Sequence, residues 1–130
     1  MTVGLADATL NSWLNALCRN SSYAVAAFWI KLHTGDPGAA GATAAFADTT
    51  RQQATFGSVA AAGAISNTTD TAWTNLSASA TLTHVSFWTA STAGTFLGSA
   101  ALTASKAVNS GDNFTIPTGD LDLAITPVAA

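Results

Sequence analysis

The sequence predicts a mainly β fold: an antiparallel β-sandwich, jelly-roll-like, with one amphipathic α-helix at its N-terminus. Apolar residues recur at helical spacing only before residue 20, whereas from Tyr23 onward short apolar runs alternate with Gly, Asn, Asp and Ser, which is typical of all-β domains. The length of 130 residues is that of one ordinary domain. We therefore assign residues 1–130 to a single domain, with the helix in 1–22 and the sandwich in 23–130.

The helix is predicted over residues 5–19. Its apolar residues stand at i, i+3, i+4, i+7 and i+8 and form one stripe, which consists of Leu10, Trp13, Leu14, Leu17 and Cys18. Packing of the stripe against the core is the favoured interpretation, and binding of a partner is the alternative. Cys18 is the only cysteine, so an intrachain disulfide is excluded, and a buried thiol is expected.

Seven strands are predicted after the helix, each bounded by turn residues. They span residues 24–33, 52–59, 80–89, 95–102, 105–108, 113–117 and 121–127. The segments between them include "NSGDN" and "TGD", which are ordinary hairpin turn sequences. Residues 36–51 and 60–72 hold too little bulk for a core and are expected to be surface loops, the second with an extended segment around Ile65.

Alternation of side chains assigns the two faces of the longest strands. In "ATLTHVSFW" one face takes Leu82, His84, Ser86 and Trp88, and the other takes Thr83, Val85 and Phe87. In "LDLAI" the inward residues are Leu121, Leu123 and Ile125, and the outward ones are Asp122 and Ala124.

The segment "HTGDPG" is expected to be a structural corner. Pro37-Gly38 fits the centre of a type II turn, and Asp36 is pushed to an extended conformation by the proline that follows. His33 is expected to end its strand and to bond to its own turn. Arg51 is expected to anchor this loop by pairing with Asp36 or Asp48.

The composition bears on partners. Only 8% of the residues are charged and the net charge is −3, which leaves no basic surface for nucleic acid. So few charges favour a subunit that buries much of its exterior, and we therefore expect a homo-oligomer. A trimer is favoured, which does not follow from the charge, and Trp13 and Trp73 are candidate interface residues. The N-terminal segment has neither the basic start of a signal peptide nor a membrane-spanning apolar run, and no membrane insertion is expected.

The known catalytic motifs are absent: no G-x-S-x-G, no glycine-rich loop followed by lysine, and no H-E-x-x-H occurs. A small hydrolase would need His33 or His84 within reach of a Ser, Thr or Asp inside a pocket. We expect no enzyme, no cofactor and no metal. Whether Asp112, Asp120 and Asp122 bind a cation stays open, although the spacing of a calcium loop is missing.

The tryptophans raise a further alternative, a carbohydrate-binding module, in which an exposed indole stacks on a sugar. Trp13, Trp29 and Trp88 lie in apolar runs and are expected in the core. Trp73 is the remaining candidate for sugar stacking.

Several segments, in their order, carry a resemblance that covers nearly the whole chain: "LHTGDPG", "TTRQQATFG", "THVSFWTASTAGTFLGSAALTASKAVNSGD" and "IPTGDLDL". The chain resembles small tailed-bacteriophage proteins that are labelled phage tail fibre proteins. The resemblance implies a non-enzymatic virion component and fixes neither a receptor nor a place on the particle. We expect other virion proteins as partners, with a host-surface glycan as a further candidate, and synthesis in the cytoplasm of the bacterial host. The resemblance implies no catalytic residues. A capsid decoration protein on the phage head is the alternative.

Overall fold

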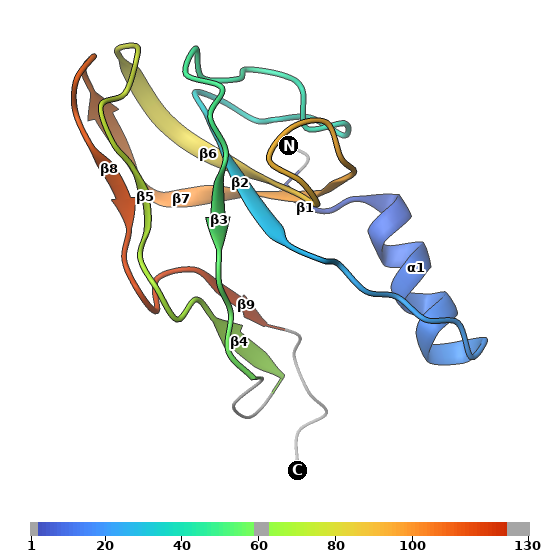
Figure 1. Ribbon diagram of the computed structural model, residues 1–130. Helices are drawn as coiled ribbons and strands as arrows, with labels where there is room; N and C mark the ends of the chain where they lie inside the picture. Colours follow the sequence, from blue (N-terminus) through green and yellow to red (C-terminus); the bar gives the residue numbers. More distant parts are fainter. Residues whose placement is uncertain (1–2, 59–62, 125–130) are drawn as a thin grey trace.

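The computed structural model describes residues 3–58 and 63–124. Its main element is a five-stranded antiparallel sheet in the order β1-β7-β6-β2-β3 (Figure 1). The strands of this sheet are β1 (Gly4–Leu5), β2 (Phe28–His33), β3 (Gln52–Ala54), β6 (Ala80–Trp88) and β7 (Phe96–Val108). The predicted mainly β, antiparallel class is confirmed.

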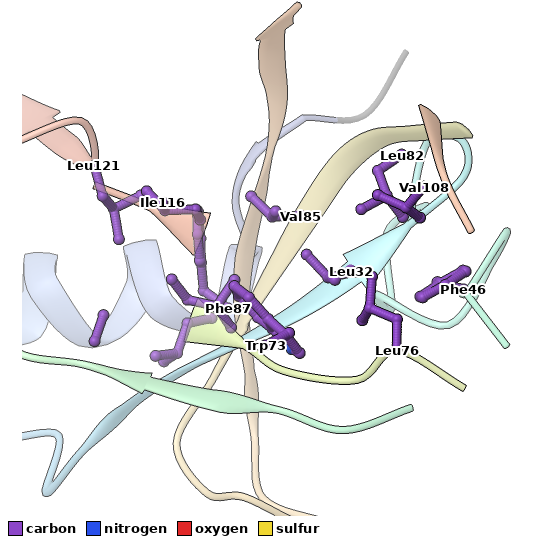
Figure 2. Close-up of a cluster of buried hydrophobic side chains, with 13 residues drawn as sticks. Leu32, Phe46, Trp73, Leu76, Leu82, Val85, Phe87, Val108, Ile116 and Leu121 are labelled. Atoms are coloured by element: carbon purple, nitrogen blue, oxygen red, sulfur yellow. The ribbon is translucent and has the colours of Figure 1, made fainter. Parts of the chain in front are cut away.

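Two short antiparallel ribbons form the second layer. One pairs β4 (Ala64–Ser66) with β9 (Asp122–Ala124), and the other pairs β5 (Thr71–Trp73) with β8 (Phe114–Ile116). The core lies between the five-stranded sheet and these ribbons, as the close-up in Figure 2 shows. From the sheet it contains Leu32 and Val85, and from the ribbon side Trp73, Ile116 and Leu121.

Most predicted strands are present, with altered bounds. The two strands predicted at 95–102 and 105–108 are one continuous strand, β7. The expected loop at 60–72 contains β4 and the start of β5, because these small and polar residues obtain their strand conformation from pairing with β9 and β8 rather than from their own hydrophobicity. The extended segment around Ile65 is thereby confirmed.

The face assignment in β6 is confirmed for His84, Ser86 and Trp88 but is wrong for Leu82. A register shift between Leu82 and His84 interrupts the alternation. An irregularity of this kind turns the preceding residues over, so Leu82 is fully buried in the same core as Val85 and Phe87.

The last strand follows the predicted alternation as far as it is described. Leu121 is buried and Leu123 packs partly buried against the core, whereas Asp122 and Ala124 are exposed. Ile125 and the rest of the predicted strand lie outside the described residues.

The helix α1 (Asp7–Cys18) lies at one end of the molecule, beside the sheet rather than on it (Figure 1). The sequence favoured packing of the apolar stripe against the core. This was wrong, because Thr9 is the only buried residue of the helix and the stripe is exposed. The expected buried thiol is also wrong, because Cys18 is exposed. Helical spacing shows that a stripe needs covering, but not which surface covers it. No helix in the described part of the chain is long and apolar enough to cross a membrane.

Candidate functional site

The side of the five-stranded sheet opposite the core, which we call the outer face, carries the polar side chains that could take part in catalysis or binding. Because residues alternate along a strand, Ile30 and Leu32 of β2 point into the core. The residues between and beside them, Lys31 and His33, belong to the outer face together with Ser86 of β6. Register places Lys31 opposite Ser86, and His33 opposite His84.

A continuous chain of hydrogen bonds runs through this outer face. The indole Nε1 of Trp88 donates to Oγ of Ser86 at 2.8 Å, and that Oγ lies 2.7 Å from Nε2 of His33. On its other side, Nδ1 of His33 lies 2.9 Å from the carbonyl oxygen of Thr43. A carbonyl only accepts, so Nδ1 carries the proton, Nε2 accepts, and the hydroxyl of Ser86 donates to it. With a neutral imidazole, every donor and acceptor in this series of hydrogen bonds has its partner.

The burial of His33 reinforces the neutral form. The side chain is fully buried, and desolvation lowers the pKa of the imidazole below its ordinary value. The neighbouring positive charge of Lys31 and the facing His84 act in the same direction, while the hydrogen bonds to Thr43 and Ala44 oppose them. His33 ends β2, as predicted, but its ring bonds to Thr43, which lies beyond the 33–38 corner that was expected to provide its partner.

Arg51 contacts the turn that follows β6. Its Nη1 donates to the carbonyl oxygens of Ala90 and Ala93 at 2.8 and 2.7 Å, and its guanidinium carbon lies 4.0 Å from the ring centre of Trp88. The carboxylate of Asp48 accepts backbone N–H groups of Thr50 and Ser77. Arg51 therefore fixes the 89–95 turn through carbonyls and an indole, and pairing with Asp36 stays a prediction.

The chain turns close to the predicted corner, but the hydrogen-bonded turn spans residues 38–41, where the N–H of Gly41 donates to the carbonyl of Gly38 at 3.1 Å. Gly38 is therefore the first residue of this turn and not the third of a type II turn, although its φ of +73° is positive as predicted. Its N–H donates to Oδ1 of Asp36. Pro37 is buried, and its carbonyl accepts the N–H of Thr43 at 2.9 Å. This turn brings the Thr43 carbonyl back to His33.

The His33–Ser86 pair meets the distance condition for a hydrolase but not the requirement for a pocket. Both residues are fully buried. A groove of about 790 Å³ lies between β7 and the 113–122 region, and a cavity of about 500 Å³ lies beside the start of α1. Neither His33 nor Ser86 lines them, so no substrate reaches this hydroxyl through either cavity.

The predicted burial of the tryptophans is wrong: the one expected to be accessible is buried, and those expected in the core are exposed or half-buried. Trp73 is 1% exposed and donates Nε1–H to the carbonyl of Thr50, so it is neither a sugar-stacking platform nor an interface residue. Trp13 is 37% exposed on α1. Trp29 and Trp88 are half-buried on the outer face. The prediction failed because it inferred burial from position within an apolar run, and the run around Trp13 belongs to a helix whose apolar stripe is exposed.

The exposed apolar residues of α1 form the second candidate site, which we call the helix face. It consists of Leu10, Trp13, Leu14 and Leu17, with exposed fractions of 42, 37, 59 and 82%. No charged residue lies among them, because the charges of this segment are Asp7 and Arg19 at the two ends of the helix. Such a contiguous apolar surface is characteristic of a contact with another protein surface.

The acidic residues considered as cation ligands are dispersed. In the described residues no three His, Cys, Asp or Glu side chains are grouped as a metal site would require. Asp122 accepts a hydrogen bond from the hydroxyl of Ser66, and Asp112 accepts the backbone N–H of Asn109. These carboxylates stabilise the ribbon and the turn that carry them.

Ser86 and Thr43 are the members of the outer-face chain that were not singled out from sequence. The alternation in β6 already placed Ser86 on the side of His84, but its meeting with His33 depends on the pairing of β2 with β6, which no local pattern specifies.

Comparison with known proteins identifies the family. No curated protein matches the chain. A family model described as "Podophage GP4 fiber I protein gp80" matches residues 4–124, which includes every helix and strand described above. The resemblance to phage tail fibre proteins is thereby confirmed. The chain belongs to the podophage GP4 fiber I protein gp80 family of phage fibre proteins, and is a structural component of the virion.

Proposed function

We propose that this chain is a non-enzymatic fibre subunit that assembles with further copies of itself through the helix face of α1, and that the assembly attaches to the phage particle. The observation that carries the proposal is the exposure of Leu10, Trp13, Leu14 and Leu17 on one stripe of a helix that buries only Thr9. A helix of 12 residues gains little stability from its own hydrogen bonds, so a packed apolar face is what would hold it.

The spacing of the helix face suits a second copy of the same helix. Leu10, Trp13 or Leu14, and Leu17 follow the alternating three- and four-residue steps by which two like helices interlock side chains. The face is neutral along its length, so like charges do not oppose the approach of identical copies. Copies of one chain can therefore cover each other's stripes without a separate adaptor.

Closed symmetry would bury this face equally in every subunit. The low charge of the chain favours an oligomer, and we favour a trimer from the way phage surface modules commonly assemble. Synthesis in the host cytoplasm and contact with other virion proteins accompany this role.

Electron microscopy of the intact particle tests the proposal. We expect copies of the chain at the tail, in mutual contact through α1. Copies spread singly over the capsid surface would contradict it and would favour the decoration alternative.

A second candidate function, glycan binding, is favoured by one observation. The groove of about 790 Å³ is lined by the half-buried ring of Phe114 together with Asn113, Lys106 and Asp120, an aromatic surface beside hydrogen-bonding groups. A glycan array with the wild type and Asp120→Ala tests it. Binding that is lost in the variant supports this candidate, whereas absence of binding by the wild type refutes it.

A further inference from the structure

A row of aromatic side chains crosses the outer face of the five-stranded sheet. Register places Trp29 of β2 opposite Trp88 of β6 on one side and opposite Gln53 of β3 on the other. Residues paired in this way point to the same face of the sheet, with their Cβ atoms about 4.5–5.5 Å apart. The ring centres of Trp88 and of Phe96 in β7 lie 5.4 Å apart. Three rings and one amide therefore follow one another across four strands.

The three rings differ in what covers them. The guanidinium of Arg51 lies over the ring of Trp88, and the ring of Phe96 lies against Gly41. Trp29 is half-buried, and its indole N–H has no hydrogen-bond partner among the described residues. Such an indole offers a ligand both an apolar surface and a hydrogen-bond donor. Trp29 is therefore the ring of this row that a ligand can use.

The strands beneath this row carry cations but no acidic residue. None of the seven acidic residues of the chain lies in a strand of the five-stranded sheet, although the net charge of the chain is −3. Lys31 follows Trp29 by two residues on the same face of β2, and Arg51 reaches this face over Trp88. Two of the four lysine and arginine residues of the chain thus lie here. The outer face is a positive region of an acidic chain.

The charge of Lys31 is not balanced by an acid in the part of the chain that the structure describes. Burial lowers the pKa of Lys31, and the positive charge of Arg51 lowers it further. Arg51 itself donates Nη1–H to the carbonyls of Ala90 and Ala93, which are neutral acceptors. An anion placed between Lys31 and Arg51 would replace their mutual repulsion by two attractions.

We propose that the outer face binds an anionic sugar, whose ring stacks on Trp29 and whose carboxylate or phosphate lies between Lys31 and Arg51. The apolar face of a sugar ring fits an indole, and the exposed amide of Gln53 beside Trp29 can bond to sugar hydroxyls. Both bonds of Arg51 to the turn use Nη1, so its other nitrogens can donate to the anion.

The number of cations favours a single charged sugar over a nucleic acid. Proteins that hold a nucleic-acid backbone commonly engage about 6–10 phosphates, whereas two cations suit one anionic group. The site is built from β2, β3 and β6 and the residue before β3, so it requires neither self-association through the helix face nor the groove beside β7.

Titration of the full chain, followed by nuclear magnetic resonance at the Trp29 indole N–H, tests the proposal without any variant. The carboxylate probe is trigalacturonic acid and the phosphate probe is glucose-6-phosphate, with the methyl ester of the first and glucose as their neutral counterparts. We expect saturable binding of one or both anionic probes at about millimolar affinity, and at least about tenfold weaker binding of the neutral counterpart. The probe that saturates identifies the anionic group.

Variants locate the site. Lys31→Met removes one cation and should weaken binding about tenfold, whereas the matched control Lys106→Met, in the groove, should bind as the wild type does. Lys31→Met should also retain the oligomeric state of the wild type, so this proposal and self-association through α1 can fail separately.

Four results would overturn the proposal: no saturable shift with either anionic probe, equal binding of a neutral counterpart, undiminished binding by Lys31→Met, or a loss confined to Lys106→Met. A single-stranded oligonucleotide that binds more tightly than both sugar probes would assign the outer face to nucleic acid and would overturn it as well.

Discussion

The guanidinium of Arg51 lies over the indole of Trp88, with 4.0 Å between its central carbon and the ring centre, while its Nη1 donates to two carbonyls of the 89–95 turn. One cation thus joins the segment before β3 to the end of β6 and to the turn that follows it. Burial lowers the pKa of Arg51 from its ordinary value, but the group stays charged at any physiological pH.

Removal of this cation should destabilise the fold measurably. Arg51→Ala loses two hydrogen bonds from a charged donor and a cation–π contact, and we expect a cost of about 1–3 kcal/mol in the free energy of unfolding. Urea denaturation measures it, with Arg19→Ala at the exposed end of α1 as the control. Equal midpoints for the two variants would show that the contacts of Arg51 contribute nothing.

The contrast between Gly38 and Arg51 illustrates what the sequence could predict. The positive φ of Gly38 after Pro37 was predictable because turn chemistry is local, whereas the bond of His33 to Thr43, beyond that corner, was not. The partner of Arg51 was not predictable, because Trp88 and Ala90 meet it only after β2 has paired with both β3 and β6. Long-range pairing decides such contacts, and nothing in a short window encodes it.

The helix shows the same limit in another form. Its existence, its bounds to within two residues and its apolar stripe were all predictable from periodicity, but its exposure was not. A stripe such as Leu10–Leu17 looks the same whether its own core or another chain covers it. The short strands β4 and β5 were hidden for the opposite reason, since their small residues have no pattern of their own.

Gly41 should be intolerant of substitution. It has φ of +68° and is buried, and a Cβ atom there would overlap the ring of Phe96. We expect Gly41→Ala to cost about 1–3 kcal/mol more than Gly111→Ala, because Gly111 has a similarly positive φ of +93° but no neighbour within 4 Å of an added Cβ. Thermal unfolding of both variants separates the overlap from the backbone strain. Equal losses in melting temperature would mean that the loop moves away from Phe96 at no cost.

Asp48 should make stability depend on acid. Burial acts to raise the pKa of its carboxyl, but hydrogen bonds from Ser77 and Thr50 outweigh burial and hold the pKa below its ordinary value of 3.8. A lowered acid pKa gives stability that is present above about pH 4 and is lost as the pH falls through the folded value. Asp48→Asn should therefore be less stable than wild type at pH 7, by about 1–2 kcal/mol, with a gap that narrows below pH 4. A gap that stays constant from pH 7 to pH 3 would contradict this.

Self-association through the helix face is the central claim, and sedimentation velocity of the purified chain at micromolar concentration tests it most directly. The design compares wild type with Leu14→Glu and Leu17→Glu, which place a charge on the 59% and 82% exposed leucines of the stripe and leave the core untouched, and with Asn11→Glu, outside the stripe, as control. We predict an oligomer for the wild type and for Asn11→Glu, and folded monomers for the two leucine variants. A wild type that sediments as a monomer, or leucine variants that retain its oligomeric state, would contradict the account.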